Sequence, residues 1–293
     1  MNEKHSVVFP VLYLGKLPDF FPFWARSCEH AGSGFRWIVY NDHISSPTEI
    51  NACVTVIPYR WGDLVQDYCQ KLGVILHPKP ASKKVLELRA FLYFLRRDED
   101  GLSDYPYWGL TDLDMVYGKL SEFLPNDRQQ YGMISAHDGR PCGPFTLFHR
   151  DASEGILSIP QLRERLADPV YHLLEESSEI SDAVRARFPV LGHEVSFQPW
   201  RDPRMNLAAV RGIWTSEGVQ VTDGKLKLPA AFFHFSKQKR RFTFSVHKPS
   251  LDHDRWVIDE SGIWSPDYTL RVVRSRAVKS AFRMRSIMRP RAS

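Results

Sequence analysis

The stretch Trp108-Gly-Leu-Thr-Asp-Leu-Asp-Met-Val-Tyr-Gly118 places two aspartates, Asp112 and Asp114, directly after a short apolar segment. Residues 107–110 predict a buried strand that ends just before the first carboxylate. Residues two apart on an extended chain point the same way, roughly 7 Å along the strand, so both carboxylates are expected on one face. This arrangement suits a hard divalent cation such as Mg²⁺ or Mn²⁺ that carries a diphosphate. Turn capping is the plainer alternative, although two like charges in an apolar segment are costly to bury without a cation or strong hydrogen bonds.

Strand-like and helix-like segments alternate along the chain up to this stretch. Apolar runs predict strands over residues 6–14, 35–40, 53–57 and 107–110, and helical spacing predicts helices over residues 18–30, 62–71 and 83–97. The alternation predicts a Rossmann-like α/β sheet with helices on both faces. In such sheets ligands bind outside the carboxyl ends of the strands, where we expect Asp42 to lie with Asp112 and Asp114.

The second half of the chain is less regular. It predicts strands over residues 131–135, 144–148 and 231–235, a hairpin over 219–228 that turns at Asp223-Gly224, and a helical segment over 161–188 broken at Pro169. We therefore expect one domain over residues 1–245 in two parts, one up to residue 125 and one over 126–245. A C-terminal extension over 246–293 is expected to follow.

Composition and cysteine spacing are those of a soluble globular protein. The 293 residues are 43% apolar, which is enough to build a full core in a chain of this length. No apolar run approaches the roughly 20 residues that span a bilayer. The four cysteines are scattered without a CxxC pair, which predicts reduced, structural cysteines in a cytoplasmic protein.

The basic residues are concentrated at the C-terminus. From Tyr268 onward there are eight basic residues and no acidic one, and the rest of the chain carries 31 basic against 34 acidic residues. The charge pattern therefore does not support a nucleic-acid-binding surface. Apolar residues recur at helical spacing between these arginines. A basic amphipathic helix of this kind could contact a membrane surface peripherally, or it could pack its apolar stripe on the body of the protein.

His234 ends an aromatic segment, and Lys237 and Lys239 follow it. The imidazole could supply a nitrogen ligand to a metal, and the lysines could contact a diphosphate. A core histidine followed by an exposed basic turn is the alternative.

Two further groups of charged residues are ambiguous. Lys84, Glu87 and Arg89 could reach a ligand over the sheet edge, but their spacing alone favours a solvated pair and a neighbour on an amphipathic helix. The carboxylate of Glu194, in the pair His193-Glu194, could bind an acceptor hydroxyl or act as a base, and a surface loop fits that sequence as well. The pair His137-Asp138, before Gly139-Arg-Pro141, allows the same two readings.

Taken together, these residues resemble the GT-A class of glycosyltransferases, and more closely a bacterial glycosyltransferase-like family that carries a DxD motif. The resemblance is carried by residues 9–19, 26–28, 39–42, 108–118, 143–148 and 234–235. It implies a GT-A-like catalytic domain over residues 1–245, with a nucleotide-binding part up to about residue 125 and a smaller acceptor-binding part over about 126–245. It also implies metal-dependent transfer, with Mn²⁺ or Mg²⁺, of a sugar from a nucleotide diphosphate donor to a glycan or glycolipid hydroxyl. The donor it implies is a UDP-sugar, and the late histidine ligand favours retention of configuration.

The resemblance also implies roles for individual residues. It implies that Asp112, Asp114 and His234 bind the metal and that Lys84, Glu87 and Arg89 hold the donor. Asp42 would lie near the nucleotide base, and Lys237 or Lys239 would contact the leaving diphosphate. The catalytic residues would be Asp114 and Glu194. The sequence departs from the family pattern in two places, because Glu87 and His193 each stand where the family usually has aspartate.

Two other classes of function stay open. A metal-dependent phosphoester hydrolase also uses clustered aspartates but needs further acidic ligands for a second metal. A catalytically silent module that binds nucleotide sugars or glycans would share the same sequence features.

Overall fold

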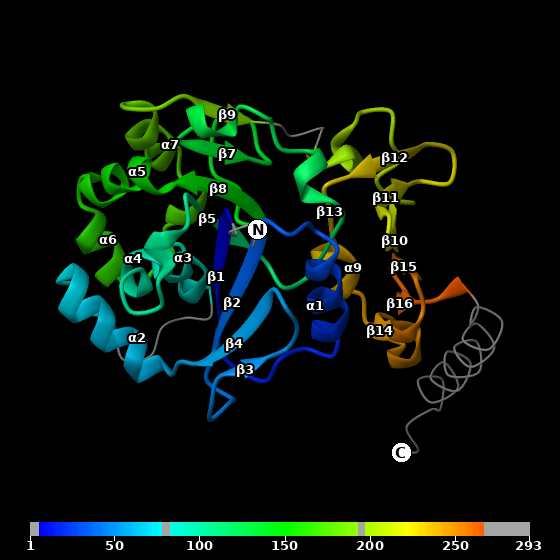
Figure 1. The fold of residues 1–293 in the computed structure, drawn as a ribbon, viewed down its shortest axis with the longest axis horizontal. Helices are drawn as coiled ribbons and strands as arrows, with labels where there is room; N and C mark the ends of the chain where they lie inside the picture. Colours follow the sequence, from blue (N-terminus) through cyan, green and yellow to red (C-terminus); the bar gives the residue numbers. More distant parts are fainter. Residues whose placement is uncertain (1–5, 78–82, 193–196, 267–293) are drawn as a thin grey trace, which may run out of the picture.

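The computed structural model describes residues 6–77, 83–192 and 197–266 (Figure 1). Its centre is an eight-stranded sheet with the strand order β3-β4-β2-β1-β5-β8-β7-β9. The strands are β1 (Val7–Tyr13), β2 (Phe35–Asn41), β3 (Thr48–Glu49), β4 (Val54–Pro58), β5 (Tyr107–Thr111), β7 (Met133–Ser135), β8 (Phe145–His149) and β9 (Val190–Gly192). The predicted His193-Glu194 contact and the predicted C-terminal basic helix lie outside the described residues.

The sheet is mixed in direction. Strands β4, β2, β1 and β5 run parallel to one another, so their carboxyl ends meet at one edge. Strand β8 runs antiparallel to both β5 and β7. The predicted fold class, a Rossmann-like mixed α/β sheet flanked by helices, is confirmed.

Helices cover both faces of this sheet. The apolar side chains of β1 point alternately to one face and to the other, so each face needs a cover. Val7, Phe9 and Val11 pack in the core that holds α1, and Val8 and Leu12 pack in the core that holds α2 to α4. Figure 1 shows α1 and α2 on opposite sides of the strands. The helices are α1 (Phe21–Glu29), α2 (Trp61–Asp67), α3 (Lys84–Arg89), α4 (Leu92–Arg96), α5 (Arg150–Ser153), α6 (Leu162–Ala167), α7 (Ser178–Arg185) and α9 (Ser236–Lys239).

The single helix predicted over residues 83–97 is wrong, because the chain forms two short helices there. Between α3 and α4, Ala90 and Phe91 donate to Glu87 and Leu88, three residues back rather than four. All five residues from Phe91 to Leu95 are buried. A straight amphipathic helix could not bury five consecutive side chains, so the break lets the apolar segment turn fully into the core.

A second sheet, which the sequence did not predict as a whole, lies beyond α1 (Figure 1). Its order is β12-β11-β10-β15-β16-β14. The strands are β10 (Arg211–Thr215), β11 (Gly218–Thr222), β12 (Lys227–Ala230), β14 (Ser245–Val246), β15 (Arg255–Asp259) and β16 (Gly262–Trp264). The hairpin predicted at Asp223-Gly224 is confirmed as the turn between β11 and β12. Because β15 pairs with β10, strands from both sides of residue 245 share this sheet.

Helix α1 joins the two sheets through its aromatic side chains. Trp24 is buried against the central sheet, whereas Phe23 packs edge-on against Trp256 with ring centroids 4.9 Å apart. Trp256 in turn stacks on Trp214 at 3.8 Å. This helix thereby helps to anchor the second sheet to the first. Among the described residues, no helix is long and apolar enough to cross a membrane.

Candidate functional site

The two aspartates lie in the short bend that follows β5 and leads into β6 (Met115–Tyr117). The position of β5 depends on Gly109. A Cβ atom there would lie 2.5 Å from Phe9 Cε1 and 2.8 Å from the Thr146 carbonyl oxygen. A residue with a side chain would therefore push β5 away from the neighbouring strands, so this glycine sets where Asp112 and Asp114 emerge.

His234 reaches the aspartates through a second strand pairing. Strand β13 (Phe232–His234) runs antiparallel to β6, and the register places His234 opposite Met115. The backbone N–H of Phe235 also donates to the carbonyl oxygen of Asp114 at 3.0 Å. This pairing brings together residues that are far apart in the sequence and fixes the histidine beside the bend.

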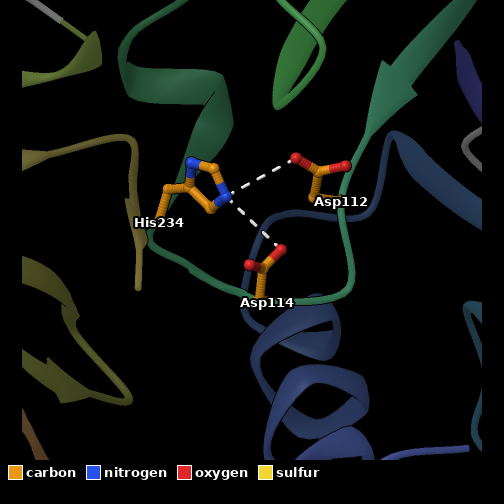
Figure 2. Close-up of side chains that lie close together, drawn as sticks. All are labelled: Asp112, Asp114 and His234. Atoms are coloured by element: carbon orange, nitrogen blue, oxygen red, sulfur yellow. Dashed lines mark ion pairs between the residues drawn. The ribbon is translucent and has the colours of Figure 1, made fainter. Parts of the chain in front are cut away.

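The three side chains predicted as metal ligands converge (Figure 2). One potential ligand atom from each of Asp112, Asp114 and His234 lies within 4.8 Å of the others. His234 Nε2 is 3.3 Å from Asp114 Oδ1 and 3.5 Å from Asp112 Oδ2. The geometry is that of a group able to hold a cation, and occupancy by a metal stays a prediction.

Cationic side chains balance the two carboxylates in this structure. Arg89 pairs with Asp112, and Lys239 Nζ lies 2.7 Å from Asp114 Oδ2. Burial alone would raise the pKa of Asp114, but His234 and Lys239 outweigh it and hold that pKa well below its usual range. Burial alone would lower the pKa of His234, but the carboxylates of Asp114 and Asp112 outweigh it and raise that pKa.

The donor set fits a divalent cation. Two carboxylate oxygens and one imidazole nitrogen suit Mn²⁺ or Mg²⁺, with water and phosphate oxygens in the remaining positions. Asp114 is only 6% exposed, whereas the side chain of Lys239 is 37% exposed and has room to leave Asp114 when a cation takes its place. Asp114 is therefore buried enough to bind a cation strongly, and Lys239 is exposed enough to leave Asp114 when that cation binds.

Asp42 lies at the carboxyl end of β2, at the predicted edge of the sheet. Its Oδ1 accepts from the N–H of Gly15 at 2.5 Å, and the neighbouring Asn41 donates to the carbonyl oxygens of Tyr13 at 2.6 Å and Gly15 at 2.9 Å. These bonds hold the loop that follows β1. The predicted contact of Asp42 with a nucleotide base stays a prediction.

Lys84 and Glu87 form a buried pair, so the solvated pair that their spacing favoured is wrong. They are 2% and 0% exposed, and Lys84 Nζ lies 2.7 Å from Glu87 Oε2. Lys84 also donates to the carbonyl oxygens of Arg165 and Val170, and Glu87 Oε1 accepts from the N–H of His172 and of Leu174, both at 3.0 Å.

The pair is buried because α6 and the segment between α6 and α7 fold over α3 and bring these backbone groups to it. Their predicted role in holding a donor is untested. Arg89, from the same helix, is the member of the predicted trio that joins the aspartates.

A cavity of about 560 Å³ opens beside His234. It contains Lys237 and His137, which the sequence had singled out, and His234 forms part of its wall. Besides Ser236 and Gln238, which flank Lys237, sequence reasoning missed four polar lining residues: Arg140, Glu176, Gln198 and Arg201. Arg140 stands within the noted Gly139-Arg-Pro141 motif, whereas nothing in the local sequence marks the other three.

The model of a family described as a family of unknown function (DUF6625) matches residues 9–155. No curated protein sequence matches the chain.

Among solved structures, similar ones include a glycosyltransferase involved in glycosylation of the major capsid of PBCV-1. It has a TM-score of 0.37 and 10% identity over 66% of this chain and 84% of that chain. The galactosyltransferase LgtC, in complex with donor and acceptor sugar analogs, gives a TM-score of 0.39 and 12% identity over 78% and 86%. Mouse xyloside xylosyltransferase 1 gives 0.31 and 12% over 69% and 90%. These likenesses are too distant to carry a function to this chain.

Proposed function

The chain belongs to the family of unknown function DUF6625, so its activity has to be inferred from the site, and we propose that it is a metal-dependent glycosyltransferase. The proposed reaction moves a sugar from a nucleotide diphosphate donor, a UDP-sugar, to a hydroxyl group of a glycan or glycolipid. The proposed cation is Mn²⁺ or Mg²⁺. We infer retention of configuration from the likeness of the late histidine ligand to that of retaining enzymes of the GT-A class.

One observation carries the proposal. Asp112, Asp114 and His234 offer ligand atoms within 4.8 Å of one another at the carboxyl end of β5. That end of a parallel strand is where open α/β sheets bind nucleotides and other phosphate ligands. A cavity lined by Lys237 and His234 adjoins the group. A cation site, a cationic side chain and an adjoining cavity are the parts that a diphosphate-linked sugar requires.

Transfer breaks the bond between the sugar carbon and the diphosphate oxygen, leaving an oxocarbenium-like centre and an anionic diphosphate. A bound cation supplies Lewis-acid stabilisation of that leaving group. Lys237 and Lys239 lie on α9, directly after His234. We assign them to the diphosphate, because preorganised positive charge lowers the barrier most where negative charge develops.

The remaining residues act on the geometry of the site. Arg89 holds the carboxylate of Asp112 toward the group, and Asp42 with Asn41 fixes the loop after β1 at the nucleotide-binding edge. Glu194 lies outside the described residues. Its proposed role as the acceptor-side carboxylate rests on the family resemblance.

The test is the binding of UDP with and without Mn²⁺, measured by calorimetry on the wild-type protein and on Asp114→Ala. We expect Mn²⁺-dependent binding in the wild type and a loss in the variant. We also expect at least about a 10²–10³-fold loss of transfer, by analogy with the removal of one charge-stabilising contact. Asp98→Ala is the matched control, because the Asp98 side chain is 81% exposed and lies away from the group. Wild-type UDP affinity in Asp114→Ala with Mn²⁺ present would contradict the site assignment.

The structure and one further assay also test the two alternative functions, a phosphoester hydrolase and a silent binding module. The described part of the group offers two carboxylates and one imidazole, which suits one cation better than the pair used by two-metal phosphoester hydrolases. Incubation with a panel of UDP-sugars then distinguishes a transferase from a silent binder. Release of UDP supports the enzyme, and metal-dependent binding without turnover of any donor and acceptor favours the binding module.

A further inference from the structure

The cavity beside His234 contains one carboxylate that the proposed donor chemistry does not use. Its volume of about 560 Å³ is in the range of sites that hold a small organic ligand. Its described lining residues fall between His137 and Gln238, in the part of the chain expected to bind the acceptor. Because His234 belongs both to this lining and to the candidate metal group, a ligand in the cavity would lie next to that group. Glu176 is the one carboxylate among the described lining residues.

Two hydrogen bonds to backbone N–H groups hold Glu176 at the cavity wall. The residue ends a short 3₁₀ helix, η6 (Leu174–Glu176), in the segment between α6 and α7. The N–H of Leu174 donates to Glu87 Oε1 at 3.0 Å, which ties this helix to the buried pair on α3. The N–H of Gly143 donates to Glu176 Oε1 at 3.2 Å, which ties the carboxylate to the loop before β8. The fold therefore places this carboxylate without a cationic partner.

The Glu176 carboxylate can accept more hydrogen bonds than the protein gives it. Among the residues that the structure describes, it accepts the bond from Gly143 and forms no ion pair. An ionised carboxylate offers about four lone-pair positions on its two oxygens. Because the side chain is only partly buried and lines the cavity, most of these positions are open to a ligand there.

Glu176 also lies close to the arginine that pairs with Asp112. A Cβ atom on Gly143 would lie 3.2 Å from Glu176 Oε1 and 3.0 Å from Arg89 Nη2, so both atoms border the same small space. Nη1 of that guanidinium pairs with Asp112. The glycine therefore lets Glu176 stand beside the support of the metal group, and a ligand bound to Glu176 would lie near the group.

A second acceptor in the lining is Gln238 on α9. Its side-chain Oε1 is buried and has no hydrogen-bond partner. A buried amide oxygen without a partner costs free energy, which is recovered when the flexible side chain turns this oxygen toward a donor in the cavity. Gln238 and Glu176 therefore both favour a ligand that donates hydrogen bonds.

These acceptor oxygens decide which ligand chemistry fits. A carboxylate or phosphate ligand, once ionised, has no proton to donate to them. An ammonium group could donate, but Arg140 and Lys237 in the same lining oppose a further positive charge. A sugar hydroxyl both donates and accepts. It can therefore donate to Glu176 or Gln238 while its oxygen accepts from one of the two cations.

We propose that this cavity binds the acceptor as an uncharged sugar and that Glu176 accepts a hydrogen bond from one of its hydroxyl groups. The assignment to an acceptor rests on the proposed glycosyltransferase function. The binding of a sugar through its hydroxyl groups rests on the cavity alone. Glu176 joins the acceptor side as a described residue, in addition to the role proposed for Glu194.

The experiment titrates neutral sugars into the full chain and follows their binding by saturation-transfer NMR. The probes are the methyl glycosides of glucose, galactose, mannose and N-acetylglucosamine, with UDP and Mn²⁺ present and absent. We expect at least one of them to bind the wild type. Its fully O-methylated form, which keeps the oxygens but has no hydroxyl donors, should bind at least about tenfold more weakly, because a hydrogen bond to a charged group is worth that much.

Variants of Glu176 separate sugar binding from a role in holding the loop before β8. Glu176→Ala should bind the sugar at least about tenfold more weakly than the wild type. Glu176→Gln keeps an oxygen for the N–H of Gly143 but loses the charge. It should keep the fold, checked by thermal melting, and bind the sugar about fivefold more weakly, because a neutral hydrogen bond is weaker than a charged one.

Both variants should bind UDP and UDP-glucose with Mn²⁺ within about twofold of the wild type, because the proposed contact is with the acceptor. Glu164→Ala is the matched control. It changes an exposed glutamate on α6 outside the cavity, and it should behave as the wild type in every titration.

Three results would overturn the proposal. Failure of all four sugars to bind the wild type, with and without nucleotide, would remove the sugar site. Wild-type sugar affinity in both Glu176 variants would limit this carboxylate to holding the loop. A loss of affinity for UDP-glucose without a loss for UDP would assign Glu176 to the donor sugar. If the wild type failed to bind UDP with Mn²⁺, the proposed function would fail separately, and the titrations without nucleotide would still decide whether the cavity binds a sugar.

Discussion

The buried pair Lys84–Glu87 and the group Asp112–Asp114–His234 both hold carboxylates against cations, but the partners differ in kind. Glu87 and Lys84 bind backbone N–H and carbonyl groups as well as each other, so their positions are fixed by the fold. The carboxylates of Asp112 and Asp114 instead contact titratable or charged side chains.

Those side chains come from α3, β13 and α9. Lys239 has room to leave when a divalent cation binds, and His234 would then become a ligand of that cation. A carboxylate neutralised by the backbone indicates a structural role, whereas one neutralised by exchangeable side chains indicates a site.

The largest effect expected from this comparison is on stability. Glu87→Ala would leave Lys84 buried without its carboxylate and two amides without an acceptor, so we expect a loss of about 3–5 kcal/mol in the free energy of unfolding. Urea denaturation measures it. Asp114→Ala should cost less, because the partners that its carboxylate loses are the side chains of His234 and Lys239, not buried backbone amides.

The variant Glu87→Gln sharpens the comparison. Glutamine keeps an oxygen for the amides of His172 and Leu174 but removes the charge. If the pair is structural, folded Glu87→Gln should bind UDP with Mn²⁺ within about twofold of wild type. A folded variant that had lost this binding would place Glu87 in the donor site, as the family resemblance implies.

The sequence predicted the first half of the fold because its strands are long apolar runs separated by amphipathic helices. Apart from the β11–β12 hairpin, it did not predict the second sheet, whose strands are short and, like Arg211–Thr215, begin or end in charged or polar residues. Strand pairing between distant segments depends on tertiary packing that local pattern does not report. This is why β6, three residues long, was not recognised beside its partner β13.

The residues of the candidate site likewise differ in whether the sequence could predict them. Asp112 and Asp114 stand out because they interrupt an apolar segment, and His234 stands out because it ends one. Arg201 and Gln198 carry no such signal, since they come together only in a cavity formed by several loops. The spacing of Lys84 and Glu87 is the same for a solvated and a buried pair, and only the segment folded over α3 decides between them.

An intermediate effect is expected from pH, through His234. A metal ligand must be unprotonated, whereas Asp114 and Asp112 raise the pKa of this imidazole in the metal-free protein. Protons therefore compete with the cation, and Mn²⁺ affinity should fall as pH falls, by up to about tenfold per pH unit below that pKa. Calorimetry between about pH 8 and pH 6 covers the range in which histidine titrates.

His234→Ala is the control for this pH dependence. It should bind Mn²⁺ more weakly at high pH and lose most of the pH dependence, because the competing proton has gone with the imidazole. An equally steep dependence in the variant would mean that another group takes up the proton. A flat profile in the wild type would mean that His234 is not a ligand.

The smallest expected effect tests whether Lys239 only occupies the position of the cation or holds Asp114 in place. If Lys239 only occupies the position of the cation, Lys239→Met should raise the affinity for Mn²⁺ alone by about two- to fivefold, a modest change because the side chain is 37% exposed and its charge is screened. UDP affinity with Mn²⁺ should not rise with it, since the proposed contact to the diphosphate is lost. Lys237→Met, which removes a lysine of the same helix, should leave the affinity for Mn²⁺ alone unchanged. Weaker Mn²⁺ binding in Lys239→Met would instead put Lys239 with Lys84, as a cation that holds its carboxylate in place, and would remove the distinction between exchangeable and fixed partners on this side of the site.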